Sequence, residues 1–471
     1  MGGSACSRAP GRAHLFVAPV RGTNVAEGAD VQAIVAVALK RFGKLDCAVN
    51  VGDGLSPAVR PVIIAGRPKS PLVMSATEQT DFREYCRRWL EENRPSPPPS
   101  PLPQAAYEVT YADHRDYLCD WQAKCYEAQL IGTDVAREYG GHGHSNLQAI
   151  ASAEVRRANV PYFINWIGLG MTAPTLLVHG TEEQKKRFLP RIFTAEEIWC
   201  QGFSEPGAGS DLVSLKTSAV RDGDNWIING SKVWTSLGAL ASWMILLART
   251  DKDDKYNGIT YFLAAMDQPG VTVRPIHKMT GETGFNEVFL ENVAVPDHLR
   301  VDKVGAGWQV AMSTLTSERG AAAGVGAVAS SESPMSGVLA LIELAKNTKR
   351  NGRAVWDDPV IRDRIVKLYE RMEASIQNGR RARLKALNGG AMRIPLQGKL
   401  TGSEIGQALG QVANAVLGLR STLYVGDEHA EADGRWPLAY MNSYTGTISG
   451  GSSEIQRNIL GERVLGLPKS K

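Results

Sequence analysis

The spacing of apolar residues changes twice along this chain, and that change constrains the fold more than any other feature. Up to about residue 198, apolar side chains recur at helical spacing. From 199 to 303 they form short runs rich in β-branched and aromatic residues, which is typical of strands. After residue 304 the helical spacing returns. We therefore predict an α+β fold with a helical domain over 76–198, a β domain over 199–303 and a second helical domain over 304–471.

Local signals refine this division. The stretch from Met74 to Glu92 places Phe82 and Trp89 on one face and predicts an amphipathic helix. The six prolines in 94–103 predict an extended connector after it. In the β domain, Asp222-Gly223 and Asn257-Gly258 each lie between two apolar runs, and such pairs are typical of tight hairpin turns.

Residues 1–75 differ from the rest of the chain. Within 11–54, Phe42-Gly-Lys-Leu-Asp leads into an apolar run that ends at Asn50, and this stretch resembles the middle of a short-chain dehydrogenase. That family needs a glycine-rich dinucleotide loop and a Tyr-x-x-x-Lys pair, and neither accompanies the stretch. We expect 1–75 to be non-catalytic: a remnant, a fusion scar or the result of a misplaced start codon.

The charge balance argues against a nucleic-acid partner. The chain has 53 Lys and Arg against 49 Asp and Glu, a net charge of +4 with histidine neutral, which is too small for a phosphate-backbone footprint. Its longest strongly apolar runs, such as Trp243–Ala248, are far shorter than the roughly 20 residues that cross a bilayer. We expect neither nucleic acid nor a membrane span.

The cysteines and histidines do not predict a metal site. The six cysteines are scattered without a C-x-x-C pair, which is typical of free thiols in a reducing compartment, so we interpret the protein as cytoplasmic. His142 and His144 are close in sequence, but two histidines without a carboxylate or cysteine partner are typical of a surface loop. We expect no metal.

The stretch from Trp199 to Asp211 is the most specific in the chain. Gly207 and Gly209 let the backbone approach a flat or charged ligand, while Ser204 and Ser210 add hydroxyl groups. By itself this pattern fits either a ligand-binding loop or a plain turn.

Three further segments accompany that loop: Asn229–Ser236, Leu246–Asp251 and Gly450–Arg457. Together the four segments resemble the acyl-CoA dehydrogenase family over residues 76–471. Their sequences are most similar to those of its actinobacterial branch. The resemblance implies an N-terminal helical domain, a middle β domain and a C-terminal four-helix bundle. It also implies FAD, with Trp234 as a wall beside the flavin ring. The cofactor-binding residues that it implies are Gln201, Phe203, Ser204, Gly209, Ser210, Trp234, Ser236, Ser452 and Glu454.

The implied reaction is α,β-dehydrogenation of an acyl-CoA in fatty-acid or related lipid metabolism. A base removes the α-proton while the β-hydride passes to the flavin, so the site needs a carboxylate and donors to the thioester carbonyl. Most of the family has a Glu where this protein has Gly450. This protein resembles the branch of the family that processes longer or branched acyl groups, in which the base is a Glu on a central helix. We expect Glu318 to be that base, with Gly450 contributing its backbone amide and Ser210, Glu318 and Arg319 contacting the substrate.

Departures from the family pattern leave alternatives open. The segment Lys349–Arg353 is the nearest match to the family's adenylate-side motif, and the glycine-rich pyrophosphate run is missing near 417–425. The chain is therefore either an active dehydrogenase, a catalytically silent subunit of a mixed oligomer, or an oxidase. The resemblance implies a homo- or hetero-oligomer, dimer or tetramer, and an acceptor such as an electron-transfer flavoprotein.

Overall fold

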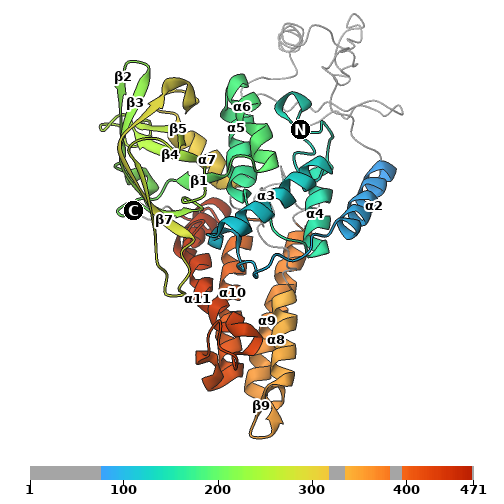
Figure 1. The fold of residues 1–471 in the computed structure, drawn as a ribbon. Helices are drawn as coiled ribbons and strands as arrows, with labels where there is room; N and C mark the ends of the chain where they lie inside the picture. The colour runs from blue at the N-terminus through green and yellow to red at the C-terminus, as the bar shows by residue number, and fades with distance from the viewer. Residues whose placement is uncertain (1–75, 318–334, 382–394, 469–471) are drawn as a thin grey trace, which may run out of the picture. The chain divides into compact units, whose positions relative to one another are not determined.

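The structure is a computed structural model that describes residues 76–317, 335–381 and 395–468 (Figure 1). The chain divides into two units near residue 73, and all described residues belong to the second, Met74–Lys471. The stretch that resembles a short-chain dehydrogenase lies outside the described residues, as do Glu318 and Arg319.

The N-terminal part of the described chain is helical, as the spacing predicted. The predicted first helix is confirmed as α2, and it buries Cys86 and Leu90. Trp121 and Phe188 lie in the same core. The proline-rich segment 94–103 contains neither helix nor strand. The helices are α2 (Ala76–Glu92), α3 (Ala112–Glu127), α4 (Gln148–Ala158), α5 (Ala173–His179) and α6 (Glu182–Thr194).

The middle part forms one eight-stranded sheet, mostly antiparallel, with strand order β6-β7-β3-β2-β4-β5-β8 and β1 parallel to β4 (Figure 1). Its inner positions bury apolar side chains such as Ile228, Leu246 and Phe262. The strands are β1 (Trp199–Gly202), β2 (Ser218–Asp222), β3 (Asn225–Ser236), β4 (Trp243–Arg249), β5 (Ile259–Ala265), β6 (Val271–Pro275), β7 (Phe285–Pro296) and β8 (Arg300–Val301).

One of the two predicted tight turns is confirmed and the other is wrong. Gly223, with φ of 57°, lies in the short turn between β2 and β3. Between β4 and β5 the chain makes a longer loop over 250–258 instead of a two-residue turn at Asn257. The reason is Asp254, whose carboxylate accepts the backbone N–H groups of Tyr256 (2.9 Å) and Asn257 (2.8 Å) and so builds a side-chain-capped turn.

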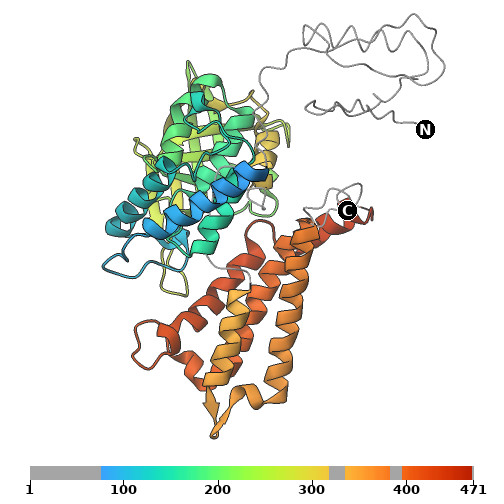
Figure 2. The same cartoon turned by 90° about the vertical axis from the view of Figure 1, so that its right-hand side faces the viewer.

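The C-terminal part is helical again, and the predicted bundle is confirmed by α8, α9, α10 and α11 (Figure 2, orange to red). Gly410 on α10 permits close packing, because a Cβ there would lie 2.9 Å from the Tyr440 Cα on α11. The helices are α7 (Gly307–Thr316), α8 (Ser336–Asn347), α9 (Pro359–Arg381), α10 (Pro395–Leu417), α11 (Arg435–Ile448) and α12 (Ser453–Ile459). Among the described residues, no helix has the length and apolar character needed to span a bilayer.

Candidate active site

The loop that follows β1 carries the first group of predicted site residues. Gln201 lies in β1, and the ring of Phe203 packs edge-on against Tyr261 with centroids 5.8 Å apart, which fixes the start of the loop in the core. A Cβ added at Gly209 would meet no atom within 4 Å, and Ser210 is exposed. The loop therefore presents open backbone and a hydroxyl group to an incoming ligand.

A buried ion pair fastens this loop to β3. The Nζ atom of Lys232, which is fully buried, donates to Glu205 Oε1 (2.8 Å) and to the Phe203 carbonyl oxygen (3.3 Å). The Glu205 carboxylate also accepts the backbone N–H groups of Lys216 (2.7 Å) and Thr217 (2.9 Å). Burial lowers the pKa of Lys232 to about 8, and the attraction of Glu205 opposes that shift.

Trp234 lies at a β-bulge. Between the pairs Lys232–Val288 and Thr235–Asn286, β3 has one residue more than β7. Trp234 takes up the extra residue with a φ of 60°, in the left-handed region that a bulky side chain seldom adopts. Bulges re-aim side chains beside functional sites, so this strained position is a reason to expect a role for the indole.

The bulge turns the indole of Trp234 outward and keeps it near the loop. The residue is 57% exposed, and its ring meets Phe285 edge-on with centroids 5.9 Å apart. The half-buried Ser236 pairs with Phe285 across the sheet. The Ser204 carbonyl oxygen accepts the N–H of Val233 (2.9 Å), so the structure brings the Gln201–Ser210 loop and the Trp234 bulge together as the resemblance implied.

Buried polar atoms without partners lie on these same elements. Gln201 Nε2, Thr235 Oγ1 and Asn286 Oδ1 are all buried and make no hydrogen bond. Buried polar groups in folded proteins nearly always have hydrogen-bond partners, so each of these three atoms is expected to bond a ligand or a water molecule. An unmet amide donor, an open glycine backbone and an exposed indole together fit the polar edge and flat face of a flavin.

The C-terminal group of predicted residues lies in the turn between α11 and α12 and in the first turn of α12. Gly450 has φ of 63°, and its carbonyl oxygen accepts Gln456 Nε2 (3.0 Å). The Ser452 hydroxyl caps α12 by accepting the Ile455 N–H (3.3 Å). Glu454 is exposed, and its own N–H and the Ser452 hydroxyl lower its pKa. These contacts fix the turn that holds Gly450 and the start of α12 that carries Glu454.

Glu318 and Arg319 come two and three residues after the end of α7 in the sequence, and that helix is firmly anchored. Thr314 Oγ1 lies 2.8 Å from Thr175 Oγ1 on α5 and 3.2 Å from the Tyr261 hydroxyl on β5. All three side chains are buried. This hydroxyl cluster fixes α7 against both the N-terminal helices and the sheet, up to the last turn before the predicted base.

A basic crevice of about 540 Å³ begins three residues after Ser210. Arg249 lines it, and its guanidinium group donates to the carbonyl oxygens of Val213 (2.6 Å) and Leu215 (3.0 Å). The exposed rim carries three lysines and one carboxylate. These rim residues are Lys216, Lys252, Lys255 and Asp253.

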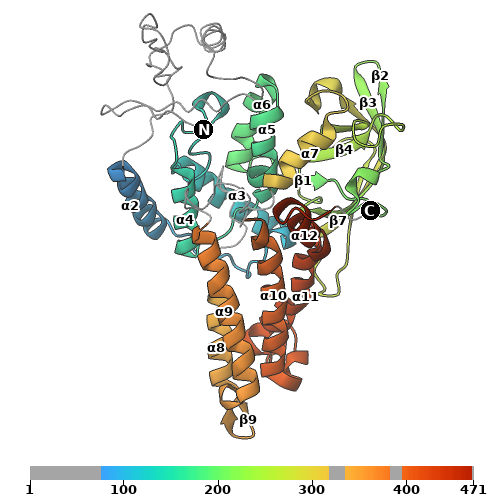
Figure 3. The same cartoon turned by 180° about the vertical axis from the view of Figure 1, so that it is seen from behind.

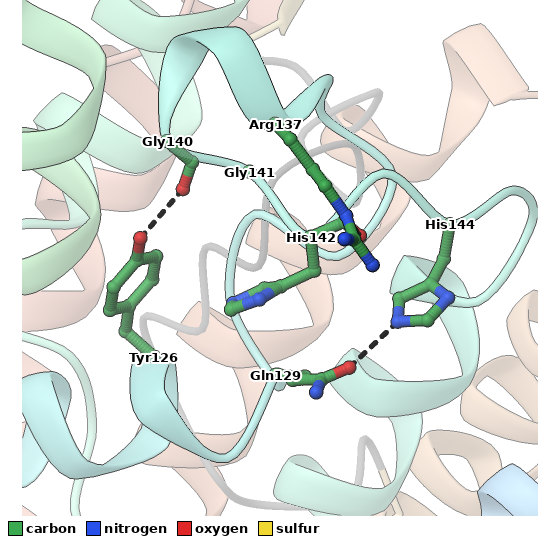
Figure 4. A pocket seen from close by; sticks show the side chains of 7 residues that line it. All are labelled: Tyr126, Gln129, Arg137, Gly140, Gly141, His142 and His144. Carbon is green, nitrogen blue, oxygen red and sulfur yellow. Dashed lines mark hydrogen bonds between the residues drawn. The ribbon is translucent and has the colours of Figure 1, made fainter.

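A second cavity, of about 370 Å³, lies beside His142 and His144 (Figure 4). His144 Nε2 is 2.7 Å from Gln129 Oε1, and the ring of His142 lies against Tyr126 with centroids 5.0 Å apart. Burial lowers the pKa of His142. Among the described residues, no group of three or more His, Cys, Asp or Glu is placed to hold a metal ion.

Sequence comparison identifies the family. The profile of the acyl-CoA dehydrogenase N-terminal domain matches residues 76–196, that of the middle domain 200–293 and that of the C-terminal domain 305–465. The chain belongs to the acyl-CoA dehydrogenase family. It is an acyl-CoA dehydrogenase, an oxidoreductase of a family whose members depend on FAD. The predicted family and order of helical, β and helical regions are confirmed.

Individual relatives agree with this assignment. Acyl-CoA dehydrogenase IpdE1 of Mycobacterium tuberculosis is 41% identical over 400 residues, covering 83% of this chain and 98% of the relative. The solved Tcur3481-Tcur3483 steroid ACAD superposes with a TM-score of 0.68 at 26% identity, over 84% of this chain and 99% of that one. The ChsE4-ChsE5 complex of M. tuberculosis gives 0.67 at 27% identity, over 84% and 100%.

Sequence reasoning missed the ion pair beneath the loop. Lys232 and Glu205 both occur inside the quoted motifs, yet neither was singled out as a site residue. The available signal was a lysine directly before the apolar pair Val233-Trp234, because a lysine that is buried requires a carboxylate partner. The unmet Thr235 and Asn286 had no comparable signal, since their burial depends on the register of β3 and β7.

Proposed function

We propose that this acyl-CoA dehydrogenase binds FAD between the Gln201–Ser210 loop and the Trp234 indole, and oxidises an acyl-CoA thioester there. The observation that carries the proposal is the bulge that turns Trp234 outward on the strand fastened to that loop. The unpartnered Gln201 amide at the start of that loop supplies a donor for a polar ring edge. Ser452 and Glu454 are proposed to complete the cofactor site from α12.

The chain's own residues carry the proton chemistry. When bound, FAD supplies the acceptor for the β-hydride. Glu318 removes the α-proton of the thioester, and the Gly450 backbone amide polarises the carbonyl on which negative charge develops. Arg319 and Ser210 hold the substrate. The Thr314 cluster supports the base indirectly by fixing α7.

The basic crevice suits the phosphate end of coenzyme A. Lys216, Lys252 and Lys255 surround it, and Val213 places it three residues beyond Ser210. Exposed lysines attract phosphates as mobile point charges, so the contribution to affinity depends on salt. We expect Lys252→Ala with Lys255→Ala to raise the KM for acyl-CoA several-fold at low salt and to leave kcat unchanged.

An anaerobic titration tests the function and the base together. Acyl-CoA substrates, including steroid acyl-CoA thioesters, are added to the purified protein while the visible absorption of bound flavin is recorded. The wild type is expected to bleach with one class of chain. Glu318→Gln should keep its flavin and lose bleaching by at least about 100-fold, the usual contribution of general base catalysis.

Two further variants are compared in that titration, the first of them as a control. Glu343→Gln alters an exposed glutamate on α8 that is paired with Lys346, and this variant should bleach like the wild type. Changing Glu454 should mainly weaken FAD retention. Equal bleaching rates in Glu318→Gln and the wild type would contradict the assignment of the base.

A second candidate function is a catalytically silent subunit of a mixed oligomer. Gly450 at the family's usual base position favours it, and the ChsE4-ChsE5 neighbour is named as a complex of two proteins. A yellow protein that bleaches only after a partner subunit is added would support this candidate. Reoxidation of the bleached flavin by oxygen, rather than by an electron-transfer flavoprotein, would identify an oxidase.

We also propose an oligomeric, cytoplasmic protein. The four cysteines in the described ranges, Cys86, Cys119, Cys125 and Cys200, are free thiols, which suits a reducing compartment. Light scattering on the purified holoprotein distinguishes a dimer or tetramer from a monomer.

A further inference from the structure

Lys278 joins three distant segments of the described chain. It lies in the loop between β6 and β7, and its side chain is 11% exposed. Its Nζ atom donates to Glu108 Oε1 (2.5 Å), Glu282 Oε2 (3.0 Å) and Asn442 Oδ1 (2.9 Å). These partners lie before α3, in the same loop, and on α11 (Figure 3). The three donor hydrogens of the ammonium group are thereby all used.

The same ammonium group lies against aromatic rings that lead to Trp234. Lys278 Nζ is 5.6 Å from the ring centroid of Phe285 and 5.9 Å from that of Tyr107. These two rings stack on each other at 5.3 Å, and Phe285 meets Trp234 edge-on at 5.9 Å. A cation beside an aromatic ring is attracted to its π-electrons, so Lys278 restrains the ring on which Trp234 rests.

Trp234 needs such restraint, because the backbone alone does not favour its position. A non-glycine residue at φ of 60° persists only where its surroundings hold it, and more than half of the residue is open to solvent. Lys232 and Thr235 fix the strand on either side of the bulge. The indole itself rests on Phe285.

We propose that Lys278 is a positioning residue for the cofactor site: it holds Phe285, and through Phe285 the Trp234 indole, against the flavin. The proposal rests on the proposed FAD site. It also makes that site depend on Glu108 and Asn442, which lie in the N-terminal and C-terminal helical regions.

A double-mutant cycle on FAD affinity tests this coupling. Flavin-free wild type, Lys278→Met, Trp234→Ala and the double variant are each titrated with FAD, and the dissociation constant and the visible spectrum of the bound flavin are recorded. We expect each single variant to weaken binding about tenfold and the double variant to be no weaker than Trp234→Ala, because coupled residues give non-additive effects. The spectral shift of Lys278→Met should resemble that of Trp234→Ala, and Lys278→Arg should restore most of the affinity.

The matched control is Lys185→Met. Lys185 also pairs with a carboxylate, Glu182 Oε1 at 3.1 Å, and lies 5.5 Å from the ring of Tyr139, but it belongs to α6. This variant should bind FAD like the wild type. If Lys278→Met fails to fold, Phe285→Leu replaces it in the experiment. This variant keeps the ion pairs of Lys278 but removes the aromatic ring between Lys278 and Trp234, and it should give the same loss of FAD affinity.

The outcomes separate the two proposals. If Trp234→Ala weakens FAD binding while Lys278→Met or its substitute Phe285→Leu does not, or if the effects simply add, the positioning role is overturned and the cofactor site stands. If Trp234→Ala leaves affinity and spectrum unchanged, the cofactor site is wrong, and the role of Lys278 falls with it.

Discussion

Two lysines lie close to the support of Trp234, and they are held in different ways. Lys232 is fully buried on the strand that carries Trp234, and its partner Glu205 lies 27 residues away in the adjoining loop. Lys278 is slightly exposed and bonds Glu108 and Asn442, which are 170 and 164 residues away. The first lysine shapes the site from within the β region. The second makes that site sensitive to both helical regions.

The difference in burial predicts a difference in energy. A charge buried completely loses its hydration and depends wholly on its partner. Both carboxylates keep backbone donors when their lysine is removed, two N–H groups for Glu205 and one for Glu108. The contrast rests on the lysines themselves, because Lys232 is fully buried and Lys278 is 11% exposed. We therefore expect the Lys232–Glu205 pair to contribute more to the free energy of unfolding. The contacts of Lys278 should contribute more to the coupling of the helical regions to the cofactor site.

The largest expected effect is that of Lys232→Met. It should lower the free energy of unfolding by about 3–5 kcal/mol, the usual loss when one partner of a buried pair is removed. Urea unfolding of the flavin-free protein measures it. Lys232→Met with Glu205→Gln removes both charges and should recover much of the loss. A single variant as stable as the wild type would break the comparison.

Lys278→Met should have a smaller effect on stability. We expect a loss of about 2 kcal/mol in the same unfolding experiment, because hydrogen bonds to a charged group are lost but the site of Lys278 is not completely closed to water. Lys185→Met should change stability by about 0.5 kcal/mol or less, because the carboxylate partner of Lys185, Glu182, is exposed to solvent. A larger loss at Lys278 than at Lys232 would reverse the proposed order.

The pH dependence sharpens the contrast. The folded protein releases the proton of Lys232 near pH 8, whereas the unfolded chain holds it until about pH 10.5. Stability should therefore rise with pH between 8 and 9, by up to about 1.4 kcal/mol for one pH unit. Above pH 9 the buried thiol of Cys86, whose pKa burial raises to about 12, opposes the rise. The doubly neutral Lys232→Met, Glu205→Gln variant should lack the increase; an identical increase there would assign it to other groups.

Asn442→Ala should give the smallest change among the variants of the two lysine networks. It removes the hydrogen bonds to Lys278 (2.9 Å) and Glu282 (2.9 Å) at a half-buried position, so we expect a loss of about 1 kcal/mol in unfolding. Its FAD affinity should still fall slightly, because it supports Lys278. A stability loss as large as that of Lys278→Met would mean that Asn442 on α11, and not Lys278, is the main stabilising residue of this network.

The sequence was sufficient to predict local order and insufficient to predict distant partners. The helix over Met74–Glu92 and the turn at Asp222-Gly223 follow from residues close in the chain, and the structure confirms both. Asn257-Gly258 was misinterpreted because the Asp254 side chain overrides the short-range turn preference. Any Asn-Gly or Asp-Gly pair between two apolar runs would have predicted the same tight turn.

The candidate site divides in the same way. The Gln201–Ser210 loop and Trp234 were found from contiguous motifs, and the structure places them together. The bulge that aims Trp234 depends on the pairing of β3 with β7, and the network at Lys278 on α11; neither is encoded in a local pattern. The assignments of Glu318 and Arg319, which lie outside the described residues, remain predictions.

Amide hydrogen exchange of the flavin-free protein, with and without FAD, tests the location of the cofactor most directly. The account predicts slower exchange on FAD binding in peptides covering 199–211 and 233–237, with no change around the cavity of His142 and His144, which serves as an internal reference (Figure 4). Protection elsewhere, with unchanged exchange in both of those peptides, would contradict the proposed site.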